Sequence, residues 1–195
     1  MREAPQRASS DALVTGCQAG MALTGIAWVL MGEYPGAVVA AVALALSVAP
    51  GRAIVNAPLR TATRSVTAVL LATHVVVGMG LGLYDSSILY DKVMHALGIG
   101  AITVVLLIAT QHYCEQNRLE LPLPLTACLV LCAAVTAGTA WELFEFSVDL
   151  TGVFIAQRGL HDTMLDLAAD TAGAVLVVVG FVASRGMDEA VLARG

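Results

Sequence analysis

The chain has 195 residues, of which 58% are hydrophobic and only 13% are charged, and its mean hydropathy is +0.81. Water-soluble domains carry about 25% charged residues, so this composition excludes one. The formal net charge of −5 at pH 7 also gives no basic surface for nucleic acid. The sequence therefore predicts an integral membrane protein.

Six apolar runs follow one another along the chain, with lengths near the roughly 20 residues that a membrane-crossing helix needs. They cover residues 12–31, 35–49, 65–83, 90–110, 123–140 and 163–184. Helices are required because unpaired backbone groups cannot face lipid, and no run alternates as barrel strands do. The predicted fold is all-α, a polytopic six-transmembrane-helix bundle forming a single integral-membrane domain over residues 1–195.

The ten Lys and Arg residues divide unevenly between the two sides of this bundle. With the N-terminus inside, eight of them face the cytoplasm, and only Lys92 and Arg158 face outward. Positive charge is retained on the cytoplasmic side of membranes. Both termini are therefore predicted to be cytoplasmic, and the basic loop 50–64 is predicted to lie against anionic head groups.

Acidic residues gather on the predicted outer side: between positions 85 and 170, eight of the chain's fifteen Asp and Glu residues map to it. Residues three or four apart share a helix face, so three predicted helices each present an acidic stripe there. The fourth helix carries Asp91 with His95, the fifth carries Glu142, Glu145 and Asp149, and the sixth carries Asp162, Asp166 and Asp170; Asp85 lies in the loop before the fourth.

Local structure accounts for some of these carboxylates. Asp91 and Asp166 occupy positions at which an acidic side chain caps a helix. Asp170, however, lies well inside an apolar run, and Glu142 and Glu145 lie at a helix C-terminus, where the helix dipole disfavours acids. Such a cluster needs a bound divalent cation, shared protons or a structural network of ion pairs.

The candidate site follows from side-chain chemistry and from position. The predicted metal ligands are Asp91, His95, Glu142, Glu145, Asp162 and Asp166, with Asp85, Asp149 and Asp170 as further acids of the same site. The candidates for substrate binding are Lys92, Trp141, Gln157 and Arg158, although Trp141 also suits a membrane anchor. Carboxylates suit Mg²⁺, Ca²⁺ or Mn²⁺, and a histidine adds Zn²⁺ or iron, so the spacing fixes neither the metal nor a catalytic residue.

The same residues carry a family resemblance. Tyr90-Asp91-Lys92 followed by His95 resembles the Asp-Lys-x-x-His element of the uncharacterised bacterial inner-membrane proteins typified by YjdF, and more distantly of the VanZ-like family associated with teicoplanin resistance. A further set of residues in this chain resembles the second half of the YjdF-type pattern: Trp141-Glu142, Glu145, Asp149, Gln157, Asp162-Thr163, Asp166 and Gly173. The resemblance covers residues 65–180 and implies a place in the bacterial inner membrane, but no activity.

Three classes of function fit these observations, all of them with the lipid bilayer as a partner. The first, which we favour, is a metal-dependent enzyme acting from the outer face on a lipid or lipid-linked substrate. The second is an accessory or assembly subunit that holds a partner membrane protein. The third is a proton or divalent-cation transporter in which Asp170 and His74 lead inward, but the sequence gives no polar path onward to the cytoplasm.

Overall fold

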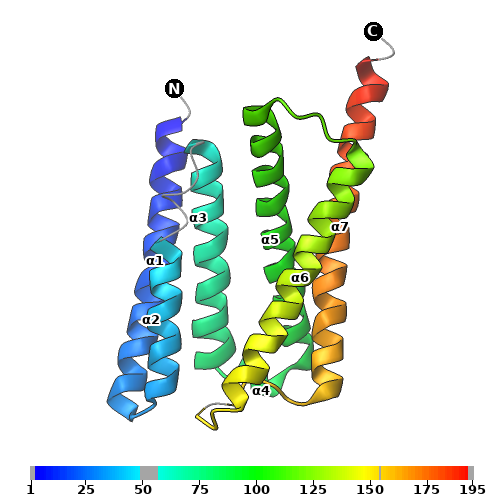
Figure 1. Ribbon diagram of the computed structural model, residues 1–195. Helices are drawn as coiled ribbons and strands as arrows, with labels where there is room; N and C mark the ends of the chain where they lie inside the picture. Colours follow the sequence, from blue (N-terminus) through cyan, green and yellow to red (C-terminus); the bar gives the residue numbers. More distant parts are fainter. Residues whose placement is uncertain (1–2, 49–56, 154, 193–195) are drawn as a thin grey trace. The chain divides into compact units, whose positions relative to one another are not determined.

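The computed structural model describes residues 3–48, 57–153 and 155–192. These residues form helices and connecting turns without a strand, which confirms the all-α prediction (Figure 1). In chain order the helices are α1 (Glu3–Met31), α2 (Tyr34–Val48), α3 (Ala57–Ala72), the π-helix η1 (Thr73–Gly80), α4 (Leu83–Ser86), α5 (Ile88–Asn117), α6 (Leu123–Asp149) and α7 (Leu160–Leu192).

Five of the described helical stretches are long and apolar enough to cross a membrane, and they confirm a multi-span membrane protein. They are Ser9–Met31, Thr63–Gly80, Ile88–Asn117, Leu123–Asp149 and Leu160–Arg185. The remaining predicted run, 35–49, corresponds to the apolar helix α2, which has 15 residues. The sixth span and the cytoplasmic position of both termini therefore stay predictions. Residues 49–56, which include much of the predicted basic loop, lie outside the described residues.

The chain divides into two compact units, residues 1–91 and 92–195. In the first unit, the core is made by Met21 of α1, Ala40 and Ala43 of α2, and Val75 of η1. The small side chains of α2 let it approach α1 closely. The buried hydroxyl of Ser47 accepts a hydrogen bond from the Gln18 amide at 3.1 Å and donates to the carbonyl of Leu44 at 2.6 Å. The polar groups between these two helices are thus satisfied internally.

The π-helix η1 holds the beginning of α5 within this first unit. The ring of Tyr84 packs against Gly78, where any side chain would overlap it, and its hydroxyl lies 2.6 Å from Nδ1 of His74. The hydroxyl of Tyr90 donates to the carbonyl of Thr73 at 2.8 Å. Because Tyr90 lies in the first turn of α5, these contacts fix where that helix starts.

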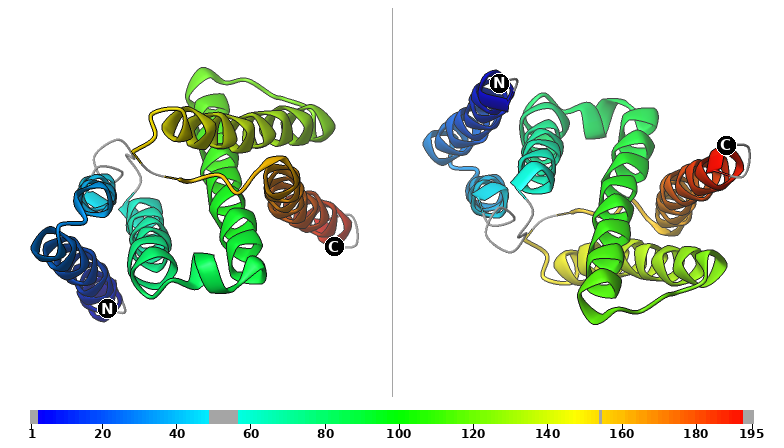
Figure 2. Two further views of the ribbon diagram at one scale, coloured as in Figure 1. Left: turned by 90° about the horizontal axis from the view of Figure 1, so that it is seen from below. Right: turned by 90° about the horizontal axis from the view of Figure 1, so that it is seen from above.

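The second unit consists of α5, α6 and α7, which alternate in direction (Figure 1). Each buries a stripe of residues spaced mainly by four. The stripes are Asp91, His95, Ile99, Thr103 and Leu107 on α5; Thr126, Val130, Ala134, Gly138 and Glu142 on α6; and Thr163, Asp166, Asp170, Ala174 and Val178 on α7. A four-residue stripe winds slowly around its helix, so helices joined along such stripes cross at an angle. Figures 1 and 2 show α6 inclined to α7 in this way.

The three stripes stack into apolar layers at one end and polar groups at the other. Leu107, Val130 and Val178 form one layer, and Ile99, Ala134 and Ala174 form the next. Beyond them, glycines allow very close helix contacts. A Cβ atom on Gly138 would lie 2.6 Å from Oδ2 of Asp170, and one on Gly173 would overlap the backbone of Ala96. The missing side chains at Gly138 and Gly173 thus allow the polar ends of the helices to pack closely together.

The close contact at Gly173 predicts that adding a methyl group there destabilises the protein more than adding one elsewhere on α7. We expect Gly173→Ala to lower the free energy of unfolding by about 2 kcal/mol, because the new methyl group must push α7 away from α5. Gly180→Ala, on the same helix with no atom within 4 Å of its added Cβ, should be neutral or slightly stabilising. Thermal unfolding of both variants in detergent, followed by circular dichroism, tests this. Equal losses would contradict the proposed close contact.

Candidate functional site

The candidate site lies at the end of the second unit where α5 and α7 begin and α6 ends (Figure 1). His95 of α5 lies at its centre. The Nδ1 atom of His95 is 3.2 Å from Oδ1 of Asp170 and 3.8 Å from Oε1 of Glu142, while Nε2 is 3.4 Å from Oδ1 of Asp166. These three carboxylate side chains are at most 4% exposed. A single imidazole is therefore surrounded by carboxylates from the two neighbouring helices.

Lys92, the only lysine of the chain, is the second cation of the cluster. Its Nζ atom lies 2.6 Å from Oδ1 of Asp162 and 2.6 Å from Oδ1 of Asp166, and it also donates to the backbone carbonyl of Asp162. Its side chain is 15% exposed. The ammonium group, predicted to bind substrate, is thus engaged within the protein and ties α5 to the first turns of α7.

Two buried carboxylates lack comparable partners. Both side-chain oxygens of Glu142 and the Oδ2 atom of Asp170 are buried and have no hydrogen-bond partner among the described residues. The hydroxyl of Thr163 lies near Glu142 and interacts with it only weakly. A buried carboxylate needs a hydrogen-bonded counter-charge, a metal ion or a proton. Beside Glu142 and Asp170 the structure places one imidazole, so the negative charge of the two carboxylates exceeds what His95 can neutralise.

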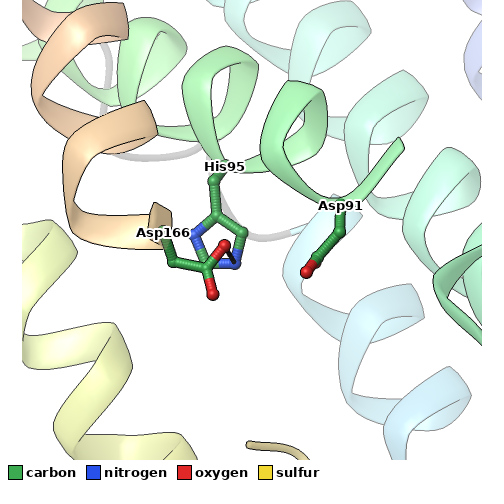
Figure 3. A group of neighbouring side chains, drawn as sticks. All are labelled: Asp91, His95 and Asp166. Carbon is green, nitrogen blue, oxygen red and sulfur yellow. Dashed lines mark ion pairs between the residues drawn. The ribbon is translucent and has the colours of Figure 1, made fainter. Parts of the chain in front are cut away.

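Two groups of side chains in the described residues offer ligand atoms that all lie within 4.8 Å of one another. The first is His95 with Glu142 and Asp170, and the second is His95 with Asp91 and Asp166 (Figure 3). Asp91 is the last residue of the first unit. It lies one turn before His95 on α5, so the helix itself places the two side chains together. Ligands of one cation bound at about 2.0–2.3 Å are spaced in this range.

Other predicted site residues make their hydrogen bonds outside this cluster. Glu145 is half-buried and accepts a hydrogen bond from the indole of Trp141 at 2.9 Å, on a more exposed face of α6. Asp149 accepts hydrogen bonds from the backbone N–H groups of Ala156 and Gln157, at 2.6 and 3.1 Å. Asp149 thus closes the loop between α6 and α7. Asp85 belongs to the short helix α4 of the first unit, and Arg158 is exposed in the α6–α7 loop.

Gly138 is a site residue that the sequence prediction missed. It faces Asp170 and leaves the space that this carboxylate occupies against α6. The signal was available, because Gly138 lies four residues before Glu142 on the same stripe of small residues. A glycine one turn before an acidic residue within an apolar helix indicates a close helix contact beside a buried charge.

Comparison with known proteins identifies the family. Residues 13–186 match the family described as predicted membrane protein (DUF2238). The chain belongs to this family. An uncharacterized protein from Thermotoga maritima is 32% identical over 101 residues, which are 51% of this chain and 51% of the relative. The chain thus spans about half the length of this curated relative, and no solved structure matches it. The YjdF-type and VanZ-like relations stay predictions.

The ion pairs of Lys92 predict a large cost for removing its charge. Lys92→Met leaves Asp162 and Asp166 without their shared ammonium group, so we expect the free energy of unfolding to fall by about 3 kcal/mol. Adding Asp166→Asn to Lys92→Met should recover part of that loss, because it removes one of the uncompensated charges. Unfolding in detergent of both variants measures the two effects. Additive losses would show that the two side chains do not interact.

The hydrogen bonds of Asp149 predict that its side chain restrains the α6–α7 loop. Asp149→Ala removes both acceptors, so hydrogen exchange at the amides of Ala156 and Gln157 should become at least about tenfold faster. Ser147→Ala, which removes a hydroxyl bonded only within α6, should leave that exchange unchanged. Mass spectrometry of the exchanged loop peptides provides the measurement. An unchanged rate in Asp149→Ala would rule out the clamp.

Proposed function

We propose that this protein is a membrane-embedded, metal-dependent enzyme that acts on a lipid or lipid-linked substrate. The observation that supports it is the pair of buried carboxylates beside His95, three of whose oxygens have no hydrogen-bond partner among the described residues. Burying such a pair without a counter-charge is costly, especially in a membrane protein. A divalent cation removes that cost and supplies a reactive centre at the same position.

A purely structural role explains the cluster less well. In a structural network of ion pairs, each buried charge has a partner, as Asp162 and Asp166 have in Lys92. Glu142 and Asp170 instead face the same imidazole from opposite helices. Charged groups that are destabilising by themselves are typical of functional sites, where the fold holds them in place for chemistry.

The position of the cluster supports a substrate that resides in the membrane. It lies near the ends of three apolar helices, and the ends of spanning helices are the parts that meet lipid head groups. Bound there, a metal ion activates water or polarises a phosphoryl oxygen. The neighbouring α6–α7 loop carries Arg158, whose exposed guanidinium suits an anionic head group, and Gln157 beside it. The distribution of basic residues predicts that this end faces away from the cytoplasm, and the family resemblance implies a bacterial inner membrane.

Turnover by purified protein in proteoliposomes tests this proposal. Two probes, dioleoyl phosphatidic acid and a polyprenyl diphosphate, offer phosphate esters in a bilayer. We expect metal-stimulated phosphate release from at least one probe, abolished by EDTA and restored by Mn²⁺ or Zn²⁺. Glu142→Gln should lower the rate by at least about 100-fold, a loss typical for removing a group that acts at the reacting centre.

The matched control is Glu115→Gln, which makes the same chemical change on an exposed residue near the other end of α5. It should keep the rate of the unchanged protein. Absence of metal-dependent release from both probes, with folded protein confirmed by its thermal transition, would refute the proposed enzyme.

A further inference from the structure

We infer that the metal ion is bound by three side chains, through Nδ1 of His95 and one carboxylate oxygen each of Glu142 and Asp170, and that Asp166 and Lys92 orient the imidazole. The inference rests on the metal of the proposed function, but not on its substrate. It replaces the broad predicted ligand set with a specific one that adds Asp170 and leaves out Asp91, Glu145, Asp162 and Asp166.

The two nitrogen atoms of His95 have different surroundings. Nδ1 lies 3.2 Å from Oδ1 of Asp170 and 3.8 Å from Oε1 of Glu142, whereas Nε2 lies 3.4 Å from Oδ1 of Asp166. A histidine ligand usually donates its other ring N–H to a carboxylate, which fixes the tautomer and the ring orientation. Without a metal, the 3.2 Å hydrogen bond between Nδ1 and Oδ1 of Asp170 requires a shared proton. A cation bound between Nδ1 and the two carboxylates would replace that proton, and the ring proton would then lie on Nε2, directed to Asp166.

Lys92 makes Asp166 unsuitable as a ligand but suitable as an orienting group. The same Oδ1 atom of Asp166 that lies 3.4 Å from Nε2 of His95 also accepts a hydrogen bond from Nζ of Lys92 at 2.6 Å. A divalent ion bound to that oxygen would be repelled by the adjacent ammonium group. The Asp91, His95 and Asp166 group is therefore the weaker site, and the buried Glu142 carboxylate, whose two oxygens have no hydrogen-bond partner among the described residues, identifies the stronger one.

The packing of α6 against α7 keeps this ligand set in place. The Oδ2 atom of Asp170 rests against Gly138, which leaves Oδ1 directed toward His95. Glu142 follows Gly138 by one turn on α6, so both ligands are fixed by a single helix contact. Rigid helices place metal ligands more accurately than loops do.

The donor set also selects a class of ion. One imidazole nitrogen with two carboxylates suits Mn²⁺, Fe²⁺ or Zn²⁺, whereas Ca²⁺ and Mg²⁺ prefer oxygen ligands alone. Three protein ligands leave coordination positions open for water or substrate, as in catalytic metal sites. We therefore expect Mn²⁺ and Zn²⁺ to bind at least about tenfold more tightly than Mg²⁺ or Ca²⁺.

Thermal unfolding of the metal-free full chain, with and without added Mn²⁺, tests the two carboxylate ligands. Mn²⁺ should raise the melting temperature of the unchanged protein. Glu142→Gln and Asp170→Asn should each weaken Mn²⁺ binding by at least about 30-fold, a typical loss of affinity for removing a charged ligand. Each variant should therefore also abolish the increase in melting temperature. Without metal, both variants should be at least as stable as the unchanged protein, because each removes an uncompensated buried charge. Glu145→Gln is the matched control and should bind Mn²⁺ normally.

Electron spin-echo spectroscopy of bound Mn²⁺ tests the nitrogen ligand. Histidine labelled with ¹⁵N at Nδ1 alone should change the strongly coupled nitrogen signal, and label at Nε2 alone should leave it unchanged. In Asp166→Asn, the coupling should alter while Mn²⁺ still binds, because the imidazole loses its orienting partner but not the metal.

The outcomes separate this inference from the proposed function. Binding lost in Glu145→Gln but kept in Glu142→Gln and Asp170→Asn, or strong coupling to Nε2, would overturn the ligand set while leaving a metal enzyme intact. Mn²⁺ binding through the named ligands, without turnover of either lipid probe, would refute the enzyme and leave the ligand set standing. Failure of the unchanged protein to bind Mn²⁺ or Zn²⁺ would overturn both.

Discussion

The cost of burying carboxylates between apolar helices is the constraint on which the second unit depends. Glu142, Asp166 and Asp170 are all buried there, and in the described part of the chain the ammonium group of Lys92 and the imidazole of His95 lie against them. The helices must therefore approach closely enough for each cation to serve more than one carboxylate. Gly138 and Gly173 permit that approach, so the packing of the apolar layers and the electrostatics of the polar end depend on the same helix contacts.

The cluster has two parts with different electrostatic character. Around Lys92, two carboxylates share one ammonium group at hydrogen-bonding distance, and this part joins α5 to α7. Around His95, two carboxylates approach an imidazole at longer distances and keep oxygens without partners. In the first part, each carboxylate accepts a hydrogen bond from the ammonium group. The second has capacity left for a cation, and Asp166 connects the two because it contacts both Lys92 and His95.

Helical periodicity and hydropathy were sufficient to predict the helices and the gathering of acids at one end. They also indicated that Asp170 lies too deep in its helix to be a cap, and the structure directs it toward His95. The separation of Glu142 from Glu145 and Asp149 was not predictable in the same way. The three share a face within α6, but the inclination of α6 to α7 decides which of them meets the other helices, and that angle depends on packing across sequence-distant residues.

The order of the helices along the chain determines when each residue of this site is made during synthesis. Lys92 and His95 belong to α5 and Glu142 belongs to α6, whereas the carboxylates of Asp162 and Asp166 that contact Lys92 belong to α7. Chains emerge from the ribosome N-terminus first, so Lys92 is made before these two carboxylates. Translation of α7 is thus the step after which the ion pairs of Lys92 with Asp162 and Asp166 can form.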